Sequence, residues 1–277
     1  MLKMAKKVVI TDLDYTLLNE NYEFAPAVDA LELLKQKKIP VILCTSKTFS
    51  ETVYFAEKIG LKDPFIVENG GAFYIPEEFA LNWNLNLALE KSGGFYFKNL
   101  GVKVDELEKF LKDFRKKFPG RIKTYQEMKK DDLMKITNLP EPLLEYSLQR
   151  QFDLPFLIEG NGELLRELEI EVRKRDLKLQ RGGIFYHLSG SHTKADALEE
   201  LFRVLGNSFI KAKKIGLGDS PNDLEMLQWV DVPVVIAKPG VGYDKILIEN
   251  LENPLLPEGT GPIAWGKAIF DILGEGG

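Results

Sequence analysis

The sequence predicts an α/β protein, with a doubly wound, Rossmann-like parallel sheet as its core and an inserted α+β domain. Short apolar runs alternate with helical patterns in the first third of the chain, and the same rhythm returns in the last third. Parallel strands joined by helices produce this alternation. The stretch between them lacks it, so we expect a core made of residues 1–80 and 185–277 and an inserted cap domain at 81–184.

The first third is expected to alternate strands and helices, at residues 8–10, 28–34, 41–44, 48–59 and 65–67. The strand runs are apolar throughout, as in sheets that are buried on both faces. The second helix has the clearest ends. Thr48 and Glu51 have the spacing of a capping box, and Gly60 is a common residue just after a last helical turn.

The last third repeats the pattern, with a helix at 193–205, strands at 215–217 and 234–236, and a second helix between these strands. Gly206 is expected to end the first helix. Ser220 can cap the second helix, whose first residue is Pro221. Proline is favourable there because the amide hydrogen that it lacks would have no helical partner.

The inserted stretch is expected to mix helices with short strands. Its clearest helix is 105–118, which is amphipathic and is followed by Pro119 and Gly120. The other expected elements are helices at 142–151 and 162–175 and strands at 156–158, 177–181 and 184–188.

Composition excludes several classes of protein. With 44% hydrophobic residues among 277, the chain can bury a large core. Its 37 Lys and Arg against 42 Asp and Glu give a net charge of −5, the wrong sign for coating nucleic acid or an anionic membrane. One cysteine cannot form an internal disulfide, and no signal peptide or membrane span is found, so we expect a cytoplasmic protein. Nothing in the sequence sets its oligomeric state.

Polar residues follow four of the expected strands, at 11–16, 45–48, 68–71 and 218–223. Ligands of open α/β sheets bind beyond the carboxyl ends of the strands, so these residues should converge. The convergence would bring together four aspartates, Asp12, Asp14, Asp219 and Asp223, which repel one another unless a cation compensates. Oxygen ligands favour Mg²⁺, and with only two histidines in the chain a His-rich transition-metal site is not expected.

The same residues suggest Mg²⁺-dependent phosphoryl transfer. Asp12 would attack phosphorus, and Asp14 would protonate the leaving oxygen and later accept a proton from the hydrolytic water. The Thr45 hydroxyl and the Lys194 ammonium would stabilise the charge on the phosphoryl oxygens.

This set of motifs resembles the haloacid dehalogenase (HAD) superfamily, whose pattern is Asp-x-Asp-x-Thr, a Thr or Ser, a Lys, and Gly-Asp-x-x-x-Asp. The matching residues here are 12–16, Thr45, Lys194 and 218–223. The resemblance implies that the Asp12 carboxylate, the Asp14 backbone carbonyl and Asp219 hold Mg²⁺, with Asp223 as a further ligand or support. It also implies that the insertion is a type 2 cap that closes over the substrate.

Within that superfamily the chain resembles the mannosyl-3-phosphoglycerate phosphatases, in the segments 45–48, 64–72, 150–155 and 216–223. Two departures are Tyr15, where Gly is commonest, and the segment 191–196, which lacks the frequent Asp-Lys-Gly. The resemblance implies a small phosphorylated sugar or glycosyl-glycerate as substrate, mannosyl-3-phosphoglycerate first and glucosyl-3-phosphoglycerate next. The residues expected to contact it are Ser46, Lys47, Glu68, Asn69, Gly70 and Arg150.

Each assignment has a plainer alternative. Asp223 is also explained as a first-turn residue of the helix capped by Ser220, and Lys194 as an ordinary first-turn lysine. Lys47 and Arg150, the latter on the expected helix 142–151, could be solvated charges. At the level of function, the alternatives are a phosphatase of sucrose-6-phosphate or a hexose phosphate, a phosphomutase, and a phospho-receiver module without turnover.

Overall fold

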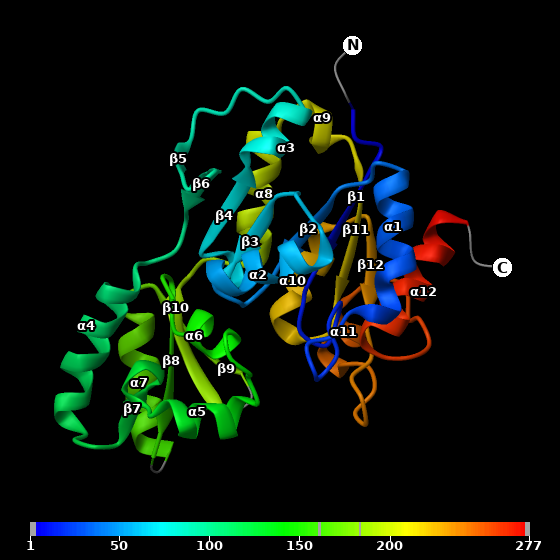
Figure 1. Cartoon of the computed structure of the whole chain (residues 1–277). Coiled ribbons are helices and arrows are strands. Elements are labelled where there is room, and N and C mark those ends of the chain that lie inside the picture. Colours follow the sequence, from blue (N-terminus) through cyan, green and yellow to red (C-terminus); the bar gives the residue numbers. More distant parts are fainter. Residues whose placement is uncertain (1–3, 160–161, 183, 275–277) are drawn as a thin grey trace.

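The computed structural model describes residues 4–159, 162–182 and 184–274. It contains a core and a cap, and Figure 1 shows the core above the cap. The core is built on an eight-stranded sheet of order β12-β11-β1-β2-β3-β4-β6-β5. Its strands are β1 (Lys7–Thr11), β2 (Val41–Cys44), β3 (Phe65–Val67), β4 (Ala72–Pro76), β5 (Glu90–Ser92), β6 (Phe95–Asn99), β11 (Lys213–Gly218) and β12 (Val232–Val235).

The first five strands of that order, from β12 to β3, are parallel, which confirms the predicted doubly wound core. Val9 of the central strand β1 pairs with Ile215 on one side and with Val41 on the other. The last three strands of the order add an antiparallel extension, which was not predicted from the sequence.

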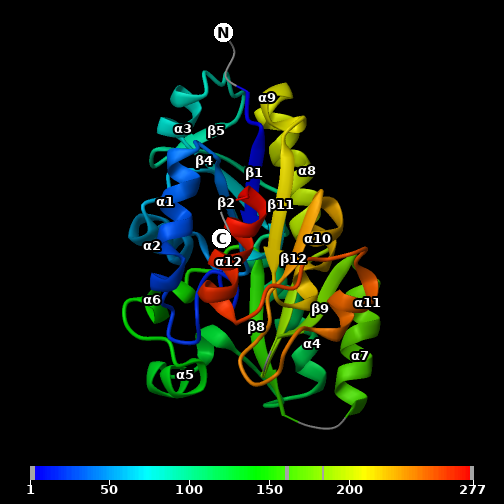
Figure 2. The ribbon, with the colours of Figure 1, turned by 90° about the vertical axis from the view of Figure 1, so that its right-hand side faces the viewer.

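Helices cover both faces of the core sheet (Figure 2). One face carries α1 (Val28–Gln36), α2 (Phe49–Ile59) and α12 (Gly261–Leu273), and the other carries α3 (Glu77–Asn82), α8 (Lys194–Leu205), α9 (Asn207–Ile210), α10 (Leu224–Trp229) and α11 (Lys245–Asn250). Alternate residues of β1 serve the two faces: Val9 packs on the first, and Val8 and Ile10 pack on the second, all fully buried. Such two-sided burial explains why the strand is apolar throughout.

The predicted helix ends are found where their capping residues stand. Thr48 caps α2 in a capping box with Glu51, and Gly60 ends this helix in the left-handed conformation. Thr193 caps α8 in the same way, and Gly206 follows its last residue. Short 3-10 helices lie at η1 (Ala25–Ala27), η2 (Glu68–Gly70), η3 (Arg115–Lys117), η4 (Tyr125–Glu127) and η5 (Pro221–Asp223).

The cap is a four-stranded antiparallel sheet of order β7-β8-β10-β9, with helices on both faces. Its strands are β7 (Ile122–Thr124), β8 (Asp153–Ile158), β9 (Leu177–Gly182) and β10 (Phe185–Gly190), and its helices are α4 (Val104–Phe114), α5 (Lys130–Thr137), α6 (Leu143–Ser147) and α7 (Gly162–Arg173). Helices α4 and α7 pack on one face through leucines such as Leu107 and Leu168.

Two expectations for the insertion need revision. The helix expected at 142–151 ends at Ser147, so Arg150 lies in the connection between α6 and β8. Strands β5 and β6 pair with the core, whereas β10 pairs with the cap. On this sheet membership we propose that the inserted domain spans about residues 101–190 rather than 81–184.

Candidate active site

Three aspartates meet where the parallel strands end. Asp12 follows β1 and donates its backbone N–H to the carbonyl oxygen of Leu217 on β11, 3.0 Å away, which holds the two strand ends together. Asp219 follows β11, and Asp223 lies one turn further on. Carboxylate oxygens of Asp12, Asp219 and Asp223 lie within 4.8 Å of one another, and all three residues are buried.

Lys194 places its charge inside this acidic cluster. Its Nζ lies 2.7 Å from Asp12 Oδ1 and 2.6 Å from Asp223 Oδ1, and the side chain is fully buried. Burial alone would lower the pKa of Lys194, but the carboxylates of Asp12 and Asp223 raise it above its usual range. The alternative of an ordinary, solvated first-turn lysine is therefore wrong. The lysine is a permanent cation bound to the proposed nucleophile.

Asp219 is held by three neighbours. Thr16 donates its hydroxyl to Oδ1 at 3.0 Å, Ser220 donates to Oδ2 at 2.6 Å, and Lys238 Nζ lies 3.0 Å from Oδ2. Lys238 was not among the residues predicted from the sequence, although it stands three residues beyond β12, at a strand end where ligand-binding residues are expected.

The cluster has the donors that a hard divalent cation requires. Burial raises the pKa of Asp12 well above its ordinary value, opposed by Lys194 and reinforced by Asp223, Asp219 and Asp14. Burial and the Asp223 charge also raise the pKa of Asp219. These directions mean that the protein's own cations do not fully compensate the carboxylates. The buried triad therefore suits a metal ion bound through oxygen.

Asp223 has two functions in the structure. Its Oδ2 accepts hydrogen bonds from the backbone N–H groups of Asp219 and Ser220, at 3.0 and 3.1 Å, as a capping residue would. Its other oxygen, Oδ1, contacts Lys194 in the acidic cluster. Asp223 therefore caps the helix with one oxygen and lies in the acidic cluster with the other, and its part in metal binding stays a prediction.

Asp14 lies at the edge of the cluster. Its side chain is 34% exposed and contacts Lys47 Nζ, 2.8 Å from Oδ1. Lys47 itself is buried, lies 3.8 Å from Glu51, and stands over the Tyr22 ring at 4.9 Å from its centroid. Burial lowers the pKa of Lys47, but Asp14 and Glu51 raise it above its ordinary value. The alternative of a solvated Lys47 is wrong.

The segments after β2 and β3 complete the floor of the site. Thr45 is buried, and its hydroxyl accepts the backbone N–H of Lys47 at 3.2 Å. Ser46 lines the cleft, as does Asn69, whose Oδ1 accepts a hydrogen bond from Asn222 at 3.1 Å.

Glu68 and Gly70, which were expected to contact the substrate, are both buried against other parts of the protein. The Glu68 carboxylate accepts backbone N–H groups of the cap at Gln151, Phe152 and Asp153, at 2.8–3.1 Å. Gly70, with φ of 101°, lies so close to α8 that a Cβ would stand 2.1 Å from the carbonyl oxygen of Thr193. Glu68 therefore attaches the cap, and Gly70 allows the helix that carries Lys194 to approach.

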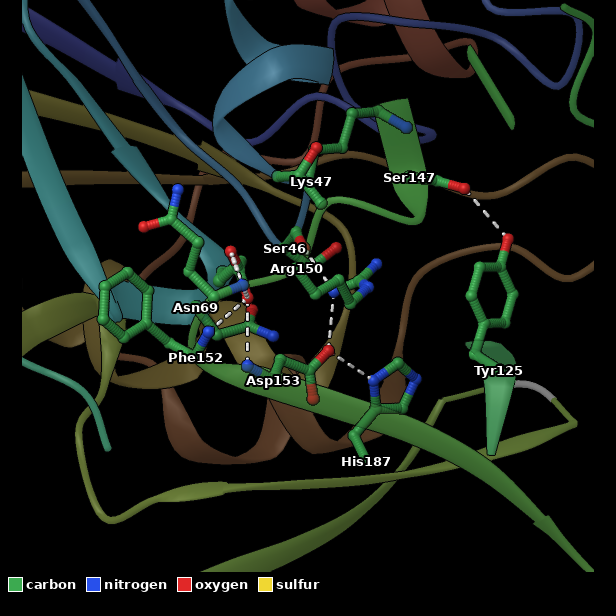
Figure 3. A network of polar contacts seen from close by, with 12 residues as sticks. Ser46, Lys47, Asn69, Tyr125, Ser147, Arg150, Phe152, Asp153 and His187 are labelled. Carbon is green, nitrogen blue, oxygen red and sulfur yellow. Dashed lines mark hydrogen bonds and ion pairs between the residues drawn. The ribbon is translucent and has the colours of Figure 1, made fainter. Parts of the chain in front are cut away.

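Arg150 belongs to a polar network on the cap (Figure 3). Its Nη1 donates to Asp153 Oδ2 at 2.6 Å and to the carbonyl oxygen of Ser46 at 3.3 Å, so it bridges the cap and the core. His187 Nδ1 lies 2.8 Å from the same Asp153 oxygen. The Arg150 side chain is only 12% exposed, which rules out the solvated alternative. No pattern in the sequence connects His187 with this network, because His187 and Asp153 lie 34 positions apart.

The cleft between core and cap has a volume of about 680 Å³. The core contributes the acidic cluster and its neighbours, and the cap contributes Gln180, Arg181 and His187. A phosphate group bound at Asp12 would thus be covered by cap side chains. Among the described residues, no helix combines the length and the apolar character that crossing a membrane requires.

The core is doubly wound, and its strand ends carry an acidic cluster bound to a lysine. Together with the inserted cap, this arrangement defines a capped hydrolase. The family profile of haloacid dehalogenase-like hydrolases matches residues 9–239, and the chain belongs to this family.

Two relatives indicate which branch it resembles, and two solved structures share its fold. It is 34% identical to a glucosyl-3-phosphoglycerate/mannosyl-3-phosphoglycerate phosphatase of Persephonella marina, covering 97% of each chain. It is 32% identical to a mannosyl-3-phosphoglycerate phosphatase of Pyrococcus furiosus, covering 89% of this chain and 95% of the relative. A HAD subclass IIB sugar phosphatase has the same fold, with a TM-score of 0.66 at 16% identity and coverage of 97% and 99%. A haloacid dehalogenase-like hydrolase from Bacteroides thetaiotaomicron does too, with a TM-score of 0.65 at 18% identity and coverage of 96% and 99%.

Proposed function

We propose that this protein is a Mg²⁺-dependent phosphatase that removes the phosphate from glucosyl-3-phosphoglycerate or mannosyl-3-phosphoglycerate. The observation that carries the chemistry is the contact of Lys194 with Asp12 inside the acidic cluster. The substrate is supported by the two relatives, whose names specify these phosphoglycerate conjugates.

The first step is attack by Asp12 on phosphorus. Lys194 holds Oδ1, which leaves Oδ2 as the attacking oxygen. The bond from phosphorus to the ester oxygen breaks as the aspartyl-phosphate forms, and Asp14 gives the leaving oxygen its proton. Lys47 fixes the position of Asp14 through their 2.8 Å contact.

The second step is hydrolysis of the aspartyl-phosphate. Asp14 accepts a proton from water, whose oxygen bonds to phosphorus and releases inorganic phosphate and free Asp12. The Thr45 hydroxyl and Lys194 stabilise the negative charge of the phosphoryl oxygens in both steps. Mg²⁺, when bound by Asp12, Asp219, Asp223 and the Asp14 carbonyl, would neutralise charge on the phosphate.

The test is phosphate release, with Mg²⁺, from both glycosyl-3-phosphoglycerates, sucrose-6-phosphate, hexose phosphates and 3-phosphoglycerate. We expect a strong preference for the glycosyl-3-phosphoglycerates and no activity in the Asp12→Asn variant. Equal activity on all compounds would contradict the proposed preference for glycosyl-3-phosphoglycerates. A transfer of phosphate to a sugar hydroxyl would indicate a mutase, and a stable aspartyl-phosphate without turnover would indicate a receiver module.

A further inference from the structure

A small pocket opens from the side of the main cleft. It has a volume of about 150 Å³ and shares Asp14, Ser46, Tyr22 and His187 with the larger cleft. Because Asp14 stands at its mouth, the pocket begins beside the place where the substrate's phosphate would be bound. Whatever enters it must lie only a few bonds from the phosphate.

Arg150 is the unusual residue of this pocket. Both of its contacts with protein oxygens use Nη1, and in the part of the chain that the structure describes its buried Nε has no hydrogen-bond partner. A buried N–H donor without an acceptor is costly. The edge formed by Nε and Nη2 presents two parallel N–H groups, and this geometry matches the two oxygens of a carboxylate.

Asp153 and His187 hold Arg150 in this orientation. Asp153 is buried, and its Oδ2 is shared between Arg150 Nη1 and His187 Nδ1, at 2.6 and 2.8 Å. Burial raises the pKa of Asp153, but His187 and Arg150 lower it below its ordinary value. The carboxylate is therefore an acceptor, and His187 must carry its proton on Nδ1. Figure 3 shows Arg150 between the segment of Ser46 and Lys47 and the pair Asp153 and His187.

The larger cleft has a different chemistry. Its cap wall carries Gln180 and Arg181, and its core wall carries Asn19 and Asn222, all of which can hydrogen-bond to hydroxyl groups. A glycosyl-3-phosphoglycerate branches at the carbon next to its phosphate-bearing carbon, with a carboxylate on one side and a sugar on the other. The small pocket and the large cleft provide two spaces of the right relative size for these branches.

Resting on the proposed function, we propose that the small pocket is an acid-recognition subsite, in which the Nε–Nη2 edge of Arg150 binds the carboxylate of the substrate. Asp153 and His187 are positioning residues for Arg150. The subsite selects phosphorylated glyceric acid conjugates over sugar phosphates that lack the acid, while the large cleft takes the sugar.

The experiment compares two substrates that differ only at the acid. One is glucosyl-3-phosphoglycerate, and the other is the same molecule with the carboxylate reduced to an alcohol. For Arg150→Met we expect kcat/KM on the acid to fall about 10- to 100-fold, mainly through KM, and kcat/KM on the alcohol to change little. Asp153→Asn should lower the preference for the acid over the alcohol by less than Arg150→Met does. Arg150→Lys should retain part of the preference that Arg150→Met loses. Arg175→Met, which removes an exposed arginine just after the end of α7, is the matched control and should leave kcat/KM on both substrates unaffected.

The outcomes separate the two proposals. If the wild type hydrolyses the acid substrate and Arg150→Met keeps the same preference for it, the subsite is refuted and the proposed function stands. If the wild type hydrolyses neither compound but releases phosphate from other esters, the proposed function fails and the subsite with it. Should Arg150→Met fail to fold because Asp153 loses its cation, the double variant Arg150→Met/Asp153→Asn removes both charges and is expected to show the same loss of preference.

Discussion

Glu68 attaches the cap to the core through a buried carboxylate, and its ionisation should be visible in the stability of the whole protein. Three backbone N–H groups of the cap point at this carboxylate, while burial opposes its charge. Burial outweighs Arg150 and the N–H groups and raises the pKa of Glu68 from 4.5 to about 7. The perturbation that isolates this effect is Glu68→Gln, which keeps the shape and cannot ionise.

The sign follows from the two pKa values. The folded pKa lies above the unfolded one, so the native protein holds the proton more tightly. The contribution of Glu68 to stability is complete below about pH 4.5 and is lost as the pH rises to about 7. At about 1.4 kcal/mol per pKa unit, this interval corresponds to about 3 kcal/mol. The wild type should therefore lose about 3 kcal/mol relative to Glu68→Gln between pH 4.5 and pH 8.

The assay is urea unfolding of both proteins, followed by circular dichroism at half-unit intervals of pH. The difference between the two free energies of unfolding cancels the other titrating groups. Glu57→Gln, at an exposed position of α2, is the control and should show no such trend. The reasoning would be refuted if the difference in free energy of unfolding did not change with pH, or if the wild type became more stable relative to the variant as the pH rises. The backbone N–H groups would then outweigh burial in setting the pKa of Glu68.

Three further outcomes are expected. Lys194→Met should lower the free energy of unfolding of the metal-free protein by about 3–5 kcal/mol at pH 7, because Asp12 and Asp223 lose their cation, and should slow phosphate release at least about 100-fold; a stable, active variant would contradict the ion-pair assignment. Gly70→Ala should destabilise by about 2–4 kcal/mol, measured as a lower midpoint in calorimetry, because its Cβ would stand 2.1 Å from the oxygen of Thr193; an unchanged midpoint would argue against this close packing. Addition of Mg²⁺ at about 100 times its dissociation constant should stabilise the protein by about 3 kcal/mol, and treatment with EDTA should remove both this gain and the activity; a midpoint that does not respond to Mg²⁺ would argue against the metal site.

The sequence was sufficient to predict that the polar residues after the parallel strands lie together, because local rules apply there. Parallel strands end at one edge of a sheet, so the residues after β1 and β11 had to meet. A capping box spans only four residues, so the sequence was enough to recognise Thr48 as the cap of its helix. Thr193 was also correctly placed at the start of a helix.

The rest depends on contacts between distant residues. Glu68 directly follows a strand of the core sheet, as a cleft residue would. Its N–H partners in the cap lie 83–85 positions further along the chain, so no local pattern could reveal that it binds the cap. Arg150 was placed on a helix because residues 142–151 have helical periodicity, yet the helix ends at Ser147 where the chain turns into β8. Strand β5 is exposed, so no pattern of burial marks it in the sequence.

The position of β1 between β2 and β11 has a consequence for synthesis on the ribosome. Val9 finds its partner Val41 early, but its second partner, Ile215, emerges only after the entire cap has been made. Until then one edge of the central strand stays unpaired, and nascent chains that are released early would expose it to other chains. Any fragment that stops before Lys194 also lacks the cation and two of the three clustered aspartates, so under the proposed mechanism partially synthesised chains should not act on phosphate esters.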